Sequence, residues 1–280
     1  MSEENKIDFN DLQKKAVSHP LVTDKFTADP SAHVFDGKIY IYPSYDIDAG
    51  IPFNDNGDHF GMRDYHVYSM NSPDDLKAMD LGKILDIDDV PWAKRQMWAP
   101  DIAKKDNKYY FFFPAKDKDD IFRIGVATSN SPIGPFIPEP KYIEGSYSID
   151  PAVFDDNGEF YMYFGGIWGG QLQKYRKNKY NINNDLLSDK ESAFGPIVAK
   201  MSADMKSFDS EPKEILILDE KGNPLLAGDN KRRYFEGPWV HKFNNKYYLS
   251  YSTGDTHYIC YAIGENPLGP FHYIGRILEP

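Results

Sequence analysis

Three acidic residues with a similar local setting are the candidates for chemistry. Asp29 and Asp150 each stand directly before a proline, and Glu236 stands two residues before Pro238. Proline restricts the preceding residue to extended backbone, so we expect each acid at the start of a strand rather than on a flexible loop tip. Three carboxylates around one pocket would repel one another, and some of their pKa values would rise unless cations intervened.

The neighbours of these acids predict different roles. Glu236 has the apolar neighbours Phe235 and Trp239, which favour the neutral carboxyl of a general acid. Asp29 is flanked by small residues and is the candidate general base, while Asp150 would tune the pKa of the acid and orient the substrate. This division suits glycoside hydrolysis, in which one acid protonates the leaving oxygen and one base activates water; in inverting enzymes the two lie roughly 6.5–9.5 Å apart.

A repeated segment holds the acids in register. In each copy an acid and a proline precede a few apolar residues, an Asp/Asn/Gly turn and an aromatic strand, which is a hairpin pattern. The copies are Ala28–Tyr42, Trp98–Phe111, Ile149–Tyr163 and Phe235–Tyr248. A single Asp-Pro pair would be ordinary turn chemistry. Three acids at matching repeat positions instead favour a shared function.

The repeat also predicts the fold. Each unit offers about four short strands, as in the blades of a β-propeller, and Pro-x-Gly-Pro-Phe turns recur at Pro132 and Pro267. The weaker stretch Pro196–Ser202 fills the same slot in the third unit, and a short helix is expected around Phe9–Val17. The inner strands of a propeller run in the same sense along one axis, so the three acids would meet at one mouth of the channel. A β-sandwich with accidental turn similarity is the alternative. We treat residues 1–280 as a single domain.

Composition limits the partners. The 280 residues are 41% hydrophobic and 27% charged, which is typical of a globular chain. The net charge of −11 disfavours nucleic acid and anionic membranes as partners. No stretch is long and apolar enough to span a membrane. The single cysteine, Cys260, lies in an apolar run and is expected to be buried and inert. The polar start Met1–Lys6 lacks a secretory signal, so a cytoplasmic location is expected.

Together these motifs resemble glycoside hydrolase family 43, in its β-xylosidase/α-L-arabinofuranosidase branch. The matching segments are Asp29-Pro30, Trp98–Asp101, Ser148–Pro151, Phe235–Trp239, Tyr251–Asp255 and Pro267–Phe271. The resemblance runs from about His19 to Pro280. It implies a five-bladed propeller and an inverting, exo- or endo-acting enzyme on arabinose- or xylose-containing polysaccharides. It also implies that Asp29, Asp150 and Glu236 match the base, the pKa modulator and the acid, and that no cofactor is required for the chemistry.

Only four blade units are recognisable, which departs from the family pattern. The family's fifth blade carries a histidine that often helps hold a central calcium ion and an arginine near the sugar. We therefore expect the last blade to be missing from this chain or supplied by a second polypeptide, with a closed four-bladed ring as the alternative. A structural calcium ion is possible, but the blade with its expected ligand is not in this chain, and no metal ligand is assigned.

Four further residues are candidates for substrate binding. Trp98 and Trp168 could stack on a sugar face, although core packing suits Trp98 equally well. Asp101 could bind substrate, but its offset position in the repeat favours a structural role. His257 could be either a pocket residue or a core histidine.

Three other features carry weaker signals. The acidic loop Asp46–Asp58 is interpreted as a solvated insertion near the rim of the active site. Arg232 and Arg233 could meet substrate hydroxyls, and a solvated loop is the simpler interpretation. His33 is expected to pack.

The sequence therefore predicts an inverting, exo-acting hydrolase that releases xylose or arabinose from short hemicellulose oligosaccharides. A non-catalytic carbohydrate-binding propeller and an endo-arabinanase are the alternatives. The expected partner is a small oligosaccharide.

Overall fold

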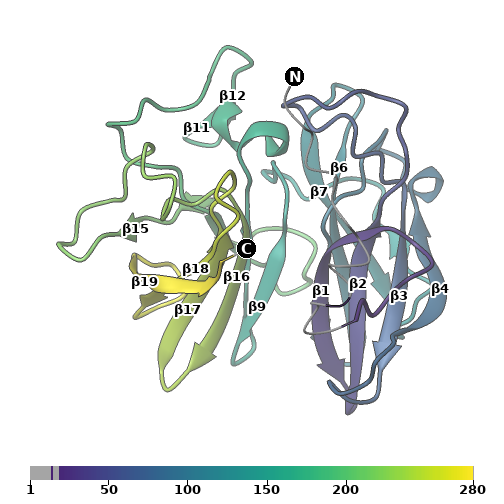
Figure 1. The fold of residues 1–280 in the computed structure, drawn as a ribbon. Helices are drawn as coiled ribbons and strands as arrows, with labels where there is room; N and C mark the ends of the chain where they lie inside the picture. The colour runs from purple at the N-terminus through teal and green to yellow at the C-terminus, as the bar shows by residue number, and fades with distance from the viewer. Residues whose placement is uncertain (1–13, 15–18, 280) are drawn as a thin grey trace.

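Four sheets, one for each predicted unit, follow one another around a common axis in the computed structural model, which describes residue 14 and residues 19–279 (Figure 1). The first sheet contains β1 (Thr27–Phe35), β2 (Lys38–Tyr45), β3 (Asp64–Met70) and β4 (Met79–Asp86). The second contains β5 (Asp101–Lys105), β6 (Lys108–Lys116), β7 (Phe122–Ser129) and β8 (Ile137–Pro138). The third contains β9 (Ala152–Asp156), β10 (Glu159–Phe164), β13 (Ile197–Lys200) and β14 (Lys213–Glu214). The fourth contains β16 (Glu236–Phe243), β17 (Lys246–Ser252), β18 (Ile259–Gly264) and β19 (Phe271–Leu278), with β15 (Ile217–Leu218) parallel to β19.

Short elements connect the sheets. A two-stranded ribbon joins β11 (Tyr175–Arg176) to β12 (Lys179–Tyr180), and single 3-10 turns form η1 (Ile87–Asp89), η2 (Trp168–Gly170) and η3 (Leu172–Lys174). None of the helices in the part of the chain described here is long and apolar enough to cross a lipid bilayer. The helix expected around residues 9–17 lies outside the described residues except for residue 14, which is helical.

The first strand of each unit lies at the inner edge of its sheet. β1 contacts β5, β5 contacts β9, and β9 contacts β16, so the four inner strands surround the axis in sequence order. Figure 1 shows β9 between the first sheet, in purple to blue, and the fourth, in green to yellow. The predicted all-β propeller architecture is confirmed, with four blades in the described residues.

The first and fourth sheets approach each other at the axis. The rings of His33 in β1 and Trp239 in β16 have centroids 5.4 Å apart. No strand pairing joins these two sheets between residues 19 and 279. A further blade supplied by a second polypeptide stays a prediction.

The inner hairpins turn where the sequence predicts. Positive φ angles occur in all four first turns, at Asp36, Asp106, Asn157 and Asn244, and in three of the turns the next residue also has one. Tight hairpin turns need such angles to match the twist of their strands, and Asn, Asp and Gly adopt them most readily.

The core fills the spaces between adjacent blades. Every residue of β6 after Lys108 is buried, and Phe111, Phe112 and Phe113 are fully so. Since strand side chains alternate between faces, Phe112 joins the cluster shared with the third blade, whereas Phe111 and Phe113 join the cluster shared with the first. The aromatic run in this strand therefore holds three blades together.

Two tyrosines join neighbouring blades at equivalent positions. The hydroxyl of Tyr42, in β2, donates to the carbonyl of Pro132 in the second blade at 2.8 Å. The hydroxyl of Tyr163, in β10, donates to the carbonyl of Pro267 in the fourth blade, also at 2.8 Å. The acceptors are the first residues of the two Pro-x-Gly-Pro turns, so the recurrence of this turn reflects a repeated contact between blades.

We expect Tyr163→Phe to lower the free energy of unfolding by about 1–3 kcal/mol, because a buried carbonyl loses its partner. Urea unfolding measures the change. Tyr261→Phe is the matched control, since its hydroxyl makes no hydrogen bond to the residues that the structure describes. Equal stabilities of the two variants would show that the contact contributes nothing.

Candidate active site

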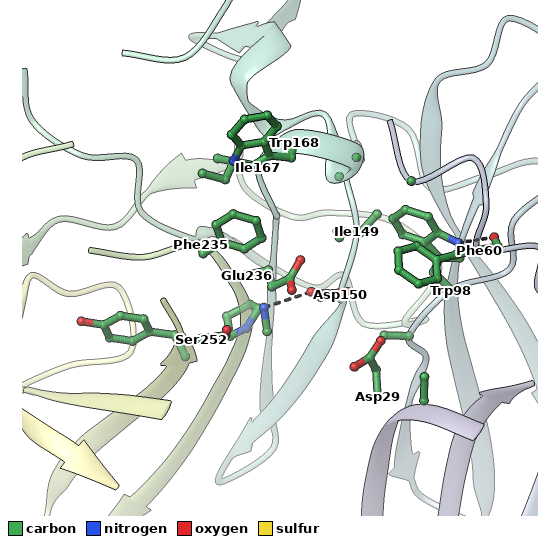
Figure 2. A pocket seen from close by; sticks show the side chains of 18 of the residues that line it. Asp29, Phe60, Trp98, Ile149, Asp150, Ile167, Trp168, Phe235, Glu236 and Ser252 are labelled. Carbon is green, nitrogen blue, oxygen red and sulfur yellow. Dashed lines mark hydrogen bonds between the residues drawn. The ribbon is translucent and has the colours of Figure 1, made fainter. Parts of the chain in front are cut away.

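A cavity of about 990 Å³ lies where the inner strands begin, and Asp29, Asp150 and Glu236 all line it. Figure 2 shows the three carboxyl groups around one space, with Trp98 and Phe60 on one side and Trp168 and Phe235 on the other. The predicted convergence of the acids is thus observed. The three belong to different blades and meet only because of the propeller.

Two inner strands carry a one-residue bulge at the acid. In β1 the pairing register shifts between Ala28 and Ser31, which brackets Asp29. In β16 it shifts between Glu236 and Trp239, so the bulge follows the acid. Bulges re-aim side chains and are common beside active sites. Here they end regular pairing at the residue that enters the cavity.

The backbone of two acids differs from the prediction. Asp29 and Asp150 have φ angles of 46° and 56°, in the left-handed region, whereas extended geometry was expected before proline. Such angles cost about 1–3 kcal/mol for a non-glycine residue and persist only where the surroundings impose them. Asp150 is held by a 2.9 Å hydrogen bond from the Gly237 nitrogen, and the bulge of β1 encloses Asp29.

Gly166 allows Glu236 to sit close to the third blade. A Cβ atom at Gly166 would lie 3.0 Å from the Cβ of Glu236 and 2.8 Å from the Cδ1 of Ile149. A larger residue would push the acid away from Asp150, which follows Ile149 in sequence. This part of the glycine cluster therefore serves close packing behind the acids.

Glu236 and Asp150 share an environment that favours a proton. Burial raises the pKa of Glu236 to about 7, and the charge of Asp29 adds to the effect. Burial also raises the pKa of Asp150 well above its usual range, with further contributions from Glu236 and Asp29. The hydrogen bond from Gly237 acts in the opposite direction. The two groups therefore titrate as a pair that holds a proton near neutral pH.

Asp29 differs from the other acids in its access to water. Its side chain is exposed in the open cavity, while Asp150 and Glu236 are half-buried. The enclosing protein still raises its pKa, and the nearby carboxylate of Asp46 raises it further. Asp46 also lines the cavity, and it was not predicted as a site residue. Its only sequence signal was its place at the start of the acidic loop.

Trp98 forms one wall of the cavity. Its indole nitrogen donates to the carbonyl of Phe60 at 3.1 Å, and its ring lies 4.7 Å from that of Phe122. A Cβ atom at Gly57 would lie 2.5 Å from the Trp98 ring. The side chain therefore lines the cavity and also packs against the core, which combines the two roles considered for it.

The acidic loop is exposed over much of its length and lines the cavity, which agrees with its interpretation as a solvated insertion near the rim. Asp58 accepts a 2.8 Å hydrogen bond from Arg95 and lies 3.5 Å from the ammonium of Lys116. The side-chain amide of Gln96 donates to the Gly57 carbonyl at 2.7 Å. The loop is therefore fixed to the second blade. Sequence reasoning missed this because the anchoring residues lie far along the chain from the loop. The loop residues that line the cavity are Asp46, Phe53, Asn54, Asp55 and Gly57, and His59 and Phe60, directly after the loop, line it too.

Trp168 and His257 also line the cavity, as predicted. Trp168 begins η2 with a φ of 58°, a strained angle for a bulky residue. The next residue, Gly169, touches the acidic loop, because a Cβ atom there would lie 3.1 Å from the carbonyl carbon of Asn56. His257 is exposed and has a φ of 52°, so it is not a core histidine.

Comparison with known proteins gives the family. Residues 18–274 match the sequence profile described as Glycosyl hydrolases family 43. The chain belongs to glycosyl hydrolase family 43. The resemblance found from its motifs is confirmed, and with it the enzyme class, a glycosidase.

Relatives and solved structures support this assignment. A xylosidase/arabinosidase of Bacteroides ovatus is 58% identical over 261 residues, which cover 93% of this chain and 80% of that protein. A β-xylosidase of Xylanibacter ruminicola is 53% identical, over 91% of this chain and 80% of the relative. The crystal structure of a β-xylosidase/α-arabinofuranosidase from a compost microbial metagenome, in complex with xylotriose and in calcium-free form, has a TM-score of 0.91. It is 64% identical and covers 95% of this chain and 82% of its own. The enzyme from Xanthomonas citri complexed with xylotriose has a TM-score of 0.91 and 54% identity, over 97% of this chain and 80% of that one.

Asp101 lies apart from the residues that line the cavity. It is buried, with 1% of its surface exposed. It lies 2.6 Å from His33 Nε2 and accepts a 2.6 Å hydrogen bond from the nitrogen of Val153. It thus links three blades near the axis, which supports the structural role rather than substrate binding. His33 packs against Phe35, as expected.

Calcium is a separate question from the chemistry. Enzymes of this family need no cofactor for catalysis. The described part of the chain contains no group of three or more His, Cys, Asp or Glu residues placed to hold a metal ion. A structural calcium ion stays a prediction.

We expect the alkaline limb of the kcat/KM profile to lie near pH 7, because an acid of raised pKa stays protonated up to that pH and loses its proton above it. In Asp150→Asn, deprotonation of Glu236 no longer leaves two adjacent carboxylates ionised, so the limb should move to lower pH. Asp74→Asn, which removes an exposed charge on the first blade, is the control. An unchanged limb in Asp150→Asn would show that Asp150 does not tune the acid.

Proposed function

We propose that this chain is an inverting, exo-acting glycosidase that releases xylose or arabinose from short hemicellulose oligosaccharides. The observation that carries the proposal is a proton-holding Glu236, with a pKa raised to about 7, in the same cavity as the solvent-accessible Asp29. A glycosidase needs such a pair, one acid protonated and one carboxylate ionised at the same pH.

Each acid has one role in the proposed reaction. Glu236 gives its proton to the glycosidic oxygen as the bond to the anomeric carbon breaks. Asp29 takes a proton from the water that attacks that carbon from the opposite face, so the configuration inverts. Asp150 is a positioning residue whose hydrogen bond to Gly237 fixes the backbone next to Glu236. Because two adjacent carboxylates repel each other, Asp150 also favours the protonated form of Glu236.

The substrate class follows from the relatives and suits the cavity. Relatives more than half identical to this chain include enzymes named for xylosidase and arabinosidase activity, and two solved neighbours hold xylotriose. In this chain, aromatic rings and carboxylates face the same space. That combination can stack on a sugar face and bind its hydroxyl groups. The net charge of −11 is compatible with a neutral substrate.

Closure of one side of the cavity favours exo action. Gly169 of η2 meets the backbone of Asn56 and Gly57 so closely that a Cβ atom would lie 3.1–3.2 Å from it. This contact joins the third blade to the loop of the first blade. A long polysaccharide could not pass through the cavity on that side, as an endo-arabinanase requires.

A non-catalytic sugar-binding propeller is the second candidate. It predicts no turnover, and it would not require an acid whose pKa is raised to neutral pH. A cytoplasmic location stays a prediction that fractionation of the source cells would test.

We expect Glu236→Gln to slow xylobiose hydrolysis by about 10²–10⁴-fold, the usual contribution of a general acid. Hydrolysis of an aryl xyloside with a good leaving group should fall far less, because its departure needs no proton. Glu265→Gln, which removes an exposed charge that pairs with Lys246, is the control. Proton NMR of the first product should show α-xylose released from a β-xyloside. Equal losses on both substrates, or release of β-xylose, would contradict the proposal.

A further inference from the structure

A second cavity of about 220 Å³ lies next to the catalytic one. Its walls come mainly from residues 186–194 and 227–234, and it shares Ile167, Trp168 and Asp255 with the catalytic cavity. The two cavities therefore meet at the Trp168 side chain, which Figure 2 shows on the far side of the site from Trp98. At about 30 Å³ for each water in the liquid, this space suits one monosaccharide rather than a chain.

The cavity contains a buried arginine that has no carboxylate partner. Arg233 is 8% exposed. Its Nε donates to the Asn230 side chain at 2.9 Å, and its Nη1 makes only a long, 3.4 Å contact with the Tyr234 carbonyl. Among residues 19–279 no acid lies within ion-pair distance of it. Burial lowers its pKa, an effect that Asp255 and Asp189 partly offset from a distance. The guanidinium also lies over the ring of Phe235, 5.8 Å from its centroid. A buried cation without a carboxylate partner is costly, so a guanidinium kept at a cavity wall points to a ligand.

Trp168 forms part of the wall that the two cavities share. Its indole Nε1 has no hydrogen-bond partner among the described residues, but less than 1 Å² of its surface is accessible, so this nitrogen does not face the open space. The strained backbone at this residue, with a φ of 58°, holds the ring between the two cavities. Strain of this kind persists at binding sites where the surrounding structure imposes it.

The wall chemistry suits a neutral sugar. Arg233 and Asn230 offer donors, Asp189 and Asp255 offer acceptors, and the Trp168 ring and apolar side chains complete the lining. One positive and two negative side chains disfavour an anion. A polyhydroxylated ring can satisfy donors and acceptors together while its carbon face covers the apolar part.

We propose that this cavity is an accessory binding site for one neutral pentose, beside the catalytic cavity and separated from it by Trp168. The pentose is either a unit of the bound oligosaccharide, such as a branch or an extension, or free sugar released by the enzyme. The identity of the sugar rests on the proposed function. Arg233 holds the pentose and takes no part in the proton transfers.

Arg232 offers a matched comparison, because it differs from its neighbour in setting. It pairs with Asp229 at 2.7 Å and with Glu220 at 3.3 Å, and it is part-exposed outside the cavity. A loop position open to solvent, the simpler interpretation of the sequence, holds for Arg232 but is wrong for Arg233.

The test compares three variants. Arg233→Met removes the guanidinium, Ala227→Leu fills the cavity without removing a hydrogen-bonding side chain, and Arg232→Met is the control. Rates are measured on three substrates: an aryl xyloside, xylotriose, and xylotriose with an arabinose branch. The rate on the aryl xyloside is also measured with added xylose or arabinose. In parallel, the indole N–H signal of Trp168 is followed by NMR during titration with each pentose.

If the pentose belongs to the substrate, both cavity variants should lose about tenfold or more in kcat/KM on an oligosaccharide relative to the aryl xyloside. If it is free sugar, both should lose part of the wild-type response to added pentose. In either case Ala227→Leu should reduce the shift of the Trp168 signal, and Arg232→Met should behave as wild type.

Two results would overturn the proposal. In the first, both cavity variants behave as the wild type does in their relative rates on the substrates, in their response to added pentose and in the shift of the Trp168 signal. The other is an equal loss on every substrate in Arg233→Met with no change in Ala227→Leu, which would mean that Arg233 is only structural. A wild-type protein that hydrolyses none of the substrates would instead contradict the proposed function. The NMR titration would still test whether the cavity binds a pentose. A pentose-dependent shift of the Trp168 signal that is lost in Ala227→Leu would support binding in the cavity. No shift in the wild type, or a shift that persists in Ala227→Leu, would reject it.

Discussion

Repulsion between like charges in one cavity is the constraint on which the site depends. Asp29, Asp150 and Glu236 come from three blades and face the same space, so they cannot all be ionised cheaply at neutral pH. The protein relieves the repulsion by keeping a proton on the half-buried Asp150–Glu236 pair while Asp29 faces water. The difference between acid and base therefore arises from burial and from neighbouring charge.

The scaffold holds this arrangement through local departures from regular structure. Bulges occur beside Asp29 and after Glu236, and left-handed backbone occurs at Asp29 and Asp150. These conformations are unfavourable in isolation, and the packed blades on either side make them stable. Buried aromatic residues, such as those of β6, supply that packing. The stability of the blades and the geometry of the acids are therefore linked.

The sequence predicted the features that repeat. Turn residues, aromatic strands and acids recur at fixed positions, and they were sufficient for the four blades and the three carboxylates. Features that depend on distant contacts were not predictable in this way. The anchoring of Asp58 by Arg95 and Lys116, and the burial of Arg233, have no periodic signal. The backbone at Asp29 follows from its bulge, whereas the preference of residues before proline predicted extended geometry.

The most direct test of the shared proton is a titration of the carboxyl carbon of Glu236 by ¹³C NMR, in the wild type and in Asp29→Asn. The account predicts a wild-type transition near pH 7 and a lower one in the variant, because the charge of Asp29 helps to raise the pKa of Glu236. A Glu236 that titrates in the ordinary range of a glutamate, about pH 4.3, and does not respond to the loss of Asp29 would contradict it.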